Sequence, residues 1–134
     1  MDAVGSSLGA PENRIGTEII ASSMRVHSVL GPGLLESTYE TCLAYELSRR
    51  ALRARKQISI PLRYDDLLID DAYRIDLLVN DLVVVEVKSI EAVHPVHRGQ
   101  VLSYLRMGGY KLGYLLNFNV AHMRDGIVRM ANGL

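Results

Sequence analysis

The sequence predicts a mixed β-sheet flanked by helices, an α/β (α+β) fold. Apolar residues follow helical spacing in the first third of the chain, and their period changes to two after Lys56. A later helical segment separates two strongly apolar strands, which is the arrangement of a crossover connection between parallel strands. With 134 residues, 49% of them hydrophobic, the chain is long and apolar enough to bury a core.

The first part of the chain predicts a tail and two helices. Residues 1–12 are rich in small residues and lack periodicity, so they are expected to form a loose tail before one domain at 13–134. Asn13 is the expected N-cap of the first helix, which Gly31-Pro32-Gly33 must end. The second helix is expected from near Leu34 to about Ala51.

The middle of the chain predicts strands. Residues 58–64 alternate between apolar and polar, with Pro61 indicating an edge strand or a bulge. After an Asp65-Asp66 turn, a second strand starts at 67–69, and 73–79 forms a further strand.

A tight turn at Asn80-Asp81 leads into 82–88, the most apolar strand of the chain, so an antiparallel meander is expected. A helix follows from His94-Pro95 to Gly108-Gly109. The strand at 112–118 is then expected to lie parallel to 82–88. A short hairpin at Asp125-Gly126 closes the domain.

Composition excludes several classes of protein. Fifteen basic and fifteen acidic residues balance, which argues against a protein that coats nucleic acid through net charge but not against a nuclease with an acidic site. No apolar run is long enough to span a membrane, and residues 1–12 do not resemble a secretory signal. The single cysteine, Cys42, excludes an internal disulfide and favours a reducing, cytoplasmic location.

Asp76, Glu86 and Lys88 stand out among the charged residues of the largely apolar hairpin at 73–88. Glu86 and Lys88 share one face of their strand, and Asp76 is expected opposite about residue 85 unless the pairing slips by one or a bulge intervenes. Two buried carboxylates need a compensating cation, and Mg²⁺ or Mn²⁺ prefers such ligands. The simpler alternative is a structural salt bridge of Glu86 with Lys88, or of Asp76 with Arg74.

These residues, in this order, resemble the PD-(D/E)xK nuclease superfamily with its restriction-endonuclease-like fold. Asp76 matches its first acidic residue and Glu86-Val87-Lys88 its (D/E)xK signature, while Gln100 and Tyr104 match the Q-x-x-x-Y element of RecB-like members. Gly33-Leu-Leu-Glu-Ser-Thr-Tyr39 resembles the motif that names the GxxExxY (also GxxExxR) family.

The segments Asp76-Leu-Leu-Val, Val85–Ser89 and Asn117-Phe-Asn119 also resemble that family. The resemblance covers nearly all of residues 13–134. The Asp65-Asp66 turn lacks the glycine expected there, a departure confined to a loop.

The resemblance implies a role for each matching residue. Asp76, Glu86 and the carbonyl of Val87 would bind Mg²⁺ or Mn²⁺, and Lys88 would position or deprotonate the attacking water. Glu36 would complete the metal shell or bind through water; its alternative is an ordinary exposed glutamate in the first turn of a helix.

Gln100 and Tyr104 would orient the site or the phosphate, although Tyr104 could equally be a core aromatic residue. The implied partner is nucleic acid, with DNA preferred over RNA. A two-fold dimer would grip a duplex better than one small domain, so a homodimer is left open.

Weaker candidates have simpler interpretations. A run of basic residues is expected near the end of the second helix: Arg49, Arg50, Arg53, Arg55 and Lys56. Such a run is expected to be a solvated surface rather than one that binds phosphates.

His94 and His97 could ligate zinc but lack a third ligand nearby, which favours a structural role. Cys42 lies on the apolar stripe and is expected to be an inert core thiol.

Three functions therefore compete. The first is a metal-dependent nuclease, which the complete set of Asp76, Glu86 and Lys88 favours. The second is a catalytically silent module that binds nucleic acid or a protein, which the small size and neutral charge favour. The third is an accessory module that acts only within a larger assembly.

Overall fold

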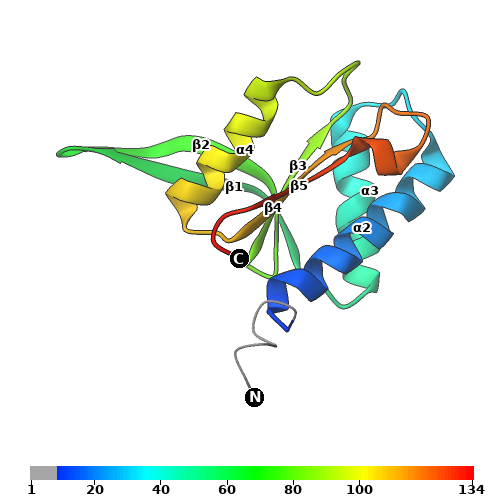
Figure 1. Cartoon of the computed structure of the whole chain (residues 1–134), viewed down its shortest axis with the longest axis horizontal. Helices are drawn as coiled ribbons and strands as arrows, with labels where there is room; N and C mark the ends of the chain where they lie inside the picture. The colour runs from blue at the N-terminus through cyan, green and yellow to red at the C-terminus, as the bar shows by residue number, and fades with distance from the viewer. Residues whose placement is uncertain (1–8) are drawn as a thin grey trace.

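The computed structural model describes residues 9–134 as one five-stranded sheet with helices on both faces (Figure 1). The strand order is β1-β2-β3-β4-β5; β3 and β4 are parallel and the other neighbours antiparallel. The elements are α2 (Pro11–Leu30), α3 (Glu36–Arg49), β1 (Ala54–Tyr64), β2 (Leu67–Val79), β3 (Val83–Lys88), α4 (Pro95–Gly108), β4 (Leu112–Asn117), the 3₁₀ helix η1 (Met123–Gly126) and β5 (Ile127–Ala131). The predicted mixed sheet flanked by helices is confirmed.

The first helix begins earlier than predicted. Pro11 occupies its first turn and Ala10 is the N-cap, so the prediction that Asn13 caps the helix is wrong. Proline favours this position because the first N–H groups of a helix have no partner within it. Pro11 and Glu12, which were predicted to belong to the tail, are therefore part of α2, and the rest of the predicted tail, residues 1–8, lies outside the described part of the chain.

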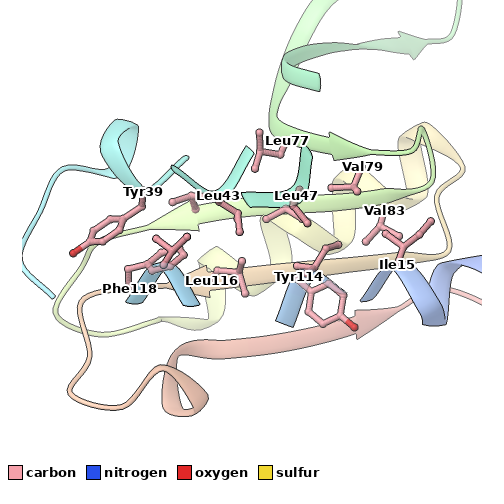
Figure 2. Packing of buried hydrophobic residues seen from close by; sticks show 14 of the residues in the cluster. Ile15, Tyr39, Leu43, Leu47, Leu77, Val79, Val83, Tyr114, Leu116 and Phe118 are labelled. Atoms are coloured by element: carbon pink, nitrogen blue, oxygen red, sulfur yellow. The ribbon is translucent and has the colours of Figure 1, made fainter. Parts of the chain in front are cut away.

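The turn between α2 and α3 is held by a tyrosine of α3. Gly31 and Gly33 have φ of 69° and 96°, which glycine adopts at little cost. The Tyr39 hydroxyl donates to the carbonyl oxygen of Gly31 at 2.5 Å and accepts from the amide of Leu34 at 3.1 Å. The Tyr39 ring stacks on Phe118, with centroids 4.5 Å apart, so the turn is fixed to the core (Figure 2).

The β1–β2 hairpin is longer than predicted because the expected strands at 67–69 and 73–79 form one continuous strand, β2. The register between β1 and β2 shifts between Ile60 and Leu62, at Pro61, which confirms both the bulge and the edge position. Beyond this point the hairpin projects from the body of the protein (Figure 1). Residues 61–72 are called the arm below.

The crossover from β3 through α4 to β4 is confirmed, but the end of the domain differs from the prediction. Asp125 and Gly126 do not form a hairpin turn; they end η1, and β5 then pairs antiparallel with β4. A Cβ at Gly126 would lie 2.0 Å from the carbonyl oxygen of Asn117. The glycine therefore serves this close approach of the backbone rather than a tight turn.

Two apolar clusters hold the layers together, one on each face of the sheet. On the α2 and α3 face, Leu43 and Leu47 pack with Leu116 (Figure 2), and on the α4 face Val101 and Leu105 pack among buried strand residues. Within residues 9–134, no helix combines the length and apolar character that crossing a membrane requires.

Candidate active site

Asp76 and Glu86 lie opposite each other where β2 and β3 separate. Val79 pairs with Val83, so the loop between the strands has three residues instead of the two that were predicted. The extra residue moves the pairing by one position, and Asp76 faces Glu86 rather than residue 85. The one-residue slip considered in the sequence is therefore what the hairpin contains.

Side chains replace backbone pairing at this point. The last paired residues of β2 and β3 are Leu77 and Val85. Beyond them, the Asp76 amide donates to Glu86 Oε2 and the Val87 amide donates to Asp76 Oδ2, both at 2.8 Å. Each carboxylate is thus bound to the opposite strand, so both are positioned before any ligand arrives.

Burial makes this pair costly to ionise. Burial, together with the negative charge of Asp76, raises the pKa of Glu86 to about 8. Burial also raises the pKa of Asp76, and the bond from the Val87 amide opposes this rise. The negative charge at the site is therefore incompletely compensated by protein groups, which is the condition under which a bound cation stabilises carboxylates.

Lys88 provides part of the compensation. Its charge lowers the pKa of both Asp76 and Glu86, although burial outweighs it in each case. Lys88 is half-buried at the end of β3, paired with Asn117 of β4. Among the ion pairs of residues 9–134 there is none between Lys88 and Glu86, and Arg74 pairs with Asp71. Neither of the two salt bridges offered as the simpler alternative is therefore present among the described residues.

Glu36 approaches the site from the first turn of α3. Its carboxylate accepts a hydrogen bond from the amide of Ser89 at 3.1 Å, and Ser89 Oγ donates to the carbonyl of Leu34 at 2.7 Å. These bonds tie the start of α3 to the residue after Lys88. The charge of Glu36 contributes to raising the pKa of Asp76, so it lies near the pair without joining it.

Two further residues belong to the site and were not predicted from the sequence. Glu40 is 9% exposed, and Gln57 Nε2 donates to its Oε1 at 3.0 Å and to Asp76 Oδ1 at 3.5 Å. Burial raises the pKa of Glu40, and the charge of Asp76 adds to the rise. The available signal was the i, i+4 spacing of Glu36 and Glu40, which places both on one face of the helix.

Gln57 could not be found from the strand pattern. Alternation placed it on the solvent side of β1, but its φ is 56°, so the strand is distorted there. Its neighbours pair with β2, Lys56 with Leu77 and Ile58 with Ile75, but Gln57 itself is not part of the ladder.

Gln100 and Tyr104 meet the site from α4. Tyr104 is buried, and burial, followed by the charges of Glu86 and Asp76, raises its pKa to about 12. A hydrogen bond between the Gln100 side chain and the Tyr104 hydroxyl opposes this rise. Tyr104 is thus both a member of the α4-side core and a neighbour of the carboxylates.

The donor set fits a hard divalent cation held by few protein ligands. Within residues 9–134, no group of three or more His, Cys, Asp or Glu side chains is arranged to hold a metal ion. The expected shell of Asp76, Glu86 and Glu36 is therefore not assembled as a three-carboxylate cluster. Mg²⁺ is commonly bound by one or two carboxylates and keeps several waters, which matches a site with two. A role for the carbonyl of Val87 stays a prediction.

Asn117 holds the loop that follows Lys88. Its Oδ1 accepts from the amides of Ile90 and Asn119, and its Nδ2 donates to the carbonyl of Ile90 at 3.0 Å. The motif segment Asn117-Phe-Asn119 therefore has a structural role beside the site.

The weaker candidates take structural roles. In the basic run, Arg50 pairs with Glu18 and Glu46, and Arg55 pairs with Asp81, as expected of a solvated face.

His94 and His97 cap the N-terminus of α4, with the His94 amide donating to His97 Nδ1 at 2.9 Å. Cys42 is partly buried against the core on the α2 and α3 side.

Comparison with known proteins assigns the sequence to a family. The sequence model of the PD-(D/E)XK nuclease superfamily matches residues 13–130, which include every site residue described above. Neither a curated protein nor a solved structure is significantly similar to the chain.

Proposed function

Because the chain belongs to the PD-(D/E)XK nuclease superfamily, we propose that it is a metal-dependent nuclease that hydrolyses phosphodiester bonds. Nucleic acid is the substrate that this superfamily implies, and its members typically use divalent metal ions. The observation that carries the proposal is the pair Asp76 and Glu86, each fixed to the other's strand, with Lys88 on the same strand as Glu86.

Each residue has a part in the proposed reaction. Asp76 and Glu86 would hold Mg²⁺ or Mn²⁺, with the carbonyl of Val87 as a further ligand. The ion would neutralise phosphate charge and lower the pKa of water. Lys88 would orient the attacking water as an ammonium, or accept its proton as an uncharged amine. As the oxygen of that water forms a bond to phosphorus, the bond from phosphorus to the leaving oxygen would break, and the leaving oxygen would take a proton from solvent water. Charged groups aimed at such a developing charge typically supply much of the acceleration.

The residues of the helices would position these groups. Glu36 would bind through water, since its carboxylate already accepts the Ser89 amide. Gln100 and Tyr104 would orient the scissile phosphate from the α4 side. Glu40 would act as a positioning residue, because Gln57 connects it to Asp76.

We also infer the narrower assignment to the GxxExxY family. Its motif residues have connected roles here: Gly33 forms the turn, Tyr39 holds that turn, and Glu36 binds the residue after Lys88. We propose DNA rather than RNA as the substrate. We also propose that the protein forms a homodimer and is located in the cytoplasm.

A catalytically silent module that binds nucleic acid or a protein is the second candidate. It is favoured by the small size and neutral net charge of the chain, 134 residues with fifteen basic and fifteen acidic side chains.

A cleavage assay separates the two candidates. Single- and double-stranded DNA and RNA are incubated with Mg²⁺ or Mn²⁺ and with the wild type, Lys88→Ala or Lys111→Ala. Loss of Lys88 should slow cleavage by about 10²–10⁴-fold, with a much smaller change in nucleic-acid affinity. Lys111 precedes β4 at the opposite end of the sheet, so its loss should change neither. Unchanged cleavage by Lys88→Ala would refute the mechanism, and absent wild-type cleavage with retained affinity would favour the silent module.

A further inference from the structure

An open pocket lies between α4 and the inner end of the arm. Its lining combines one aromatic ring from β2, one apolar side chain, a glycine and three side chains able to form hydrogen bonds. The lining residues are Tyr73, Val96, His97, Gly99, Gln100 and Ser103.

The pocket adjoins the carboxylate pair. The ring of Tyr73 packs against that of Tyr104, with centroids 5.5 Å apart and planes tilted by 60°. Besides burial, the charges of Glu86 and Asp76 raise the pKa of Tyr104, so Tyr104 lies near both carboxylates. Gln100 belongs to both places, since it lines the pocket and is hydrogen-bonded to Tyr104. A ligand in the pocket would therefore lie one side chain away from the proposed site of hydrolysis.

The groups in the pocket suit a flat heteroaromatic ligand. Tyr73 is 36% exposed although it packs on Tyr104, so part of its ring is open to a partner. His97 accepts a hydrogen bond at Nδ1, so its neutral ring carries the proton on Nε2 and can donate from there. Gln100 and Ser103 offer both donors and acceptors. Small-molecule sites commonly pair an aromatic surface with a few polar groups of this kind.

The charge of the protein makes such a contact useful. The chain is neutral overall, and several arginines outside the site are already paired with carboxylates. Phosphate contacts usually dominate nucleic-acid affinity, and a chain with no net charge adds no general electrostatic attraction to them. Stacking of a base on an aromatic side chain supplies affinity that does not depend on net charge.

We propose that this pocket receives one unpaired base, stacked on Tyr73, of a single-stranded nucleic acid whose neighbouring phosphate lies at Asp76 and Glu86. This rests on the proposed function and specifies its substrate as a single strand or a frayed end. A base paired inside an intact duplex cannot enter, because it would first have to leave its stack.

A double-mutant cycle between protein and oligonucleotide tests the proposal. Affinity of the full-length protein for a short single strand is measured by fluorescence anisotropy in the presence of a chelator, so that no cleavage occurs. The strand carries an abasic nucleotide at each position in turn. For the wild type, base removal at one position should weaken binding by about tenfold. For Tyr73→Ala the intact strand should bind about tenfold more weakly, and the same removal should have no effect.

Three variants make the result specific. Tyr73→Phe keeps the ring and should keep the sensitivity to base removal. Tyr64→Ala removes the other tyrosine of the hairpin, which is 70% exposed at its outer end, and should behave like the wild type. Gly99→Leu should block the pocket, because a Cβ at Gly99 meets no other atom within 4 Å and the side chain can occupy the open space without distorting the helix.

The outcomes separate this subsite from the proposed hydrolysis. The proposal is overturned if Tyr73→Ala and the wild type respond equally to base removal, if no position matters for the wild type, or if the protein binds no single strand. A duplex bound as tightly as the single strand would also overturn it. Sensitivity to the base at Tyr73 without any cleavage in Mg²⁺ or Mn²⁺ would support the subsite and refute the nuclease.

Discussion

The backbone amide of Asp76 donates to the carboxylate of Glu86 in the position where the next pair of the β2–β3 ladder would stand. The carboxylate of Asp76 in turn accepts a hydrogen bond from the amide of Val87, on the same strand as Glu86. The two acids therefore act as structural substitutes for backbone pairing, and their placement does not require a cation. This explains how a hairpin of almost wholly apolar residues tolerates two carboxylates at its end.

Asp76→Asn should abolish the binding of Mn²⁺ to the protein. The substitution removes the charge of one of the two proposed ligands, while the new side-chain oxygen can still accept from the Val87 amide. Isothermal titration calorimetry of wild type and variant measures the difference, with Asp81→Asn as the control because Asp81 is exposed and pairs with Arg55. Equal Mn²⁺ binding by Asp76→Asn and the wild type would contradict the metal site.

The same variant should not lower the melting temperature of the metal-free protein, because it removes repulsion between Asp76 and Glu86. A clearly lower melting temperature in chelator would instead indicate that the carboxylate of Asp76 serves a structural ion pair.

The stability of the metal-free protein should fall with rising pH. Burial raises the pKa of Glu86 from its ordinary 4.5 to about 8, so the folded state holds a proton that the unfolded state releases at lower pH. The resulting stabilisation is complete below pH 4.5 and is lost as the pH rises to about 8. Melting temperatures measured across this range should decline for the wild type and decline less for Glu86→Gln. Parallel curves for the two proteins would show that Glu86 does not cause the decline.

Glu40→Gln should weaken Mn²⁺ binding without abolishing it. Glu40 is connected to Asp76 through Gln57, and its negative charge adds to that of the site. Loss of one nearby charge that is not a ligand is expected to cost about 1 kcal/mol, roughly fivefold in affinity. The matched control is Glu46→Gln on the same helix, because Glu46 pairs with Arg50. An equal effect of the two substitutions would mean that Glu40 has no specific connection to the site.

Tyr39→Phe should destabilise the protein by about 1–3 kcal/mol, because the Leu34 amide and the Gly31 carbonyl lose their shared partner at a fully buried side chain. Urea denaturation measures the loss, and Tyr45→Phe at an exposed tyrosine of the same helix serves as the control. A loss no larger than that of Tyr45→Phe would show that solvent replaces both bonds.

The sequence predicted the parts of the site that local rules determine. Alternation placed Glu86 and Lys88 on one face of a strand, and the i, i+4 spacing placed Gln100 and Tyr104 on one face of a helix. The pairing of Asp76 with Glu86 was predicted only to within one position, since one additional residue in a hairpin loop shifts the whole register.

Other features depend on contacts between distant segments. Gln57 enters the site through a positive φ that no residue pattern indicates, and Glu40 is buried only because β1 lies against α3. Gly126 was predicted to be a turn residue, but glycine is needed there because a side chain would collide with the carbonyl of Asn117. Such long-range packing decides between local structures that a sequence permits equally.

The arm has a consequence for how the protein behaves at high concentration. It projects three exposed apolar side chains, Tyr64 of β1 and Leu67 and Leu68 of β2. The strand β1 is an edge of the sheet, and exposed edges recruit strands from other molecules into aggregates. Pro61 removes a donor from that edge, and the register shift beside it interrupts the flat surface that a second strand would need. Four exposed aspartates on the arm add repulsion between copies, and a bond from Ser59 lowers the pKa of Asp71 so that it stays ionised. The other three aspartates are Asp65, Asp66 and Asp70. The arm is therefore protected against edge-to-edge polymerisation while its apolar side chains remain exposed.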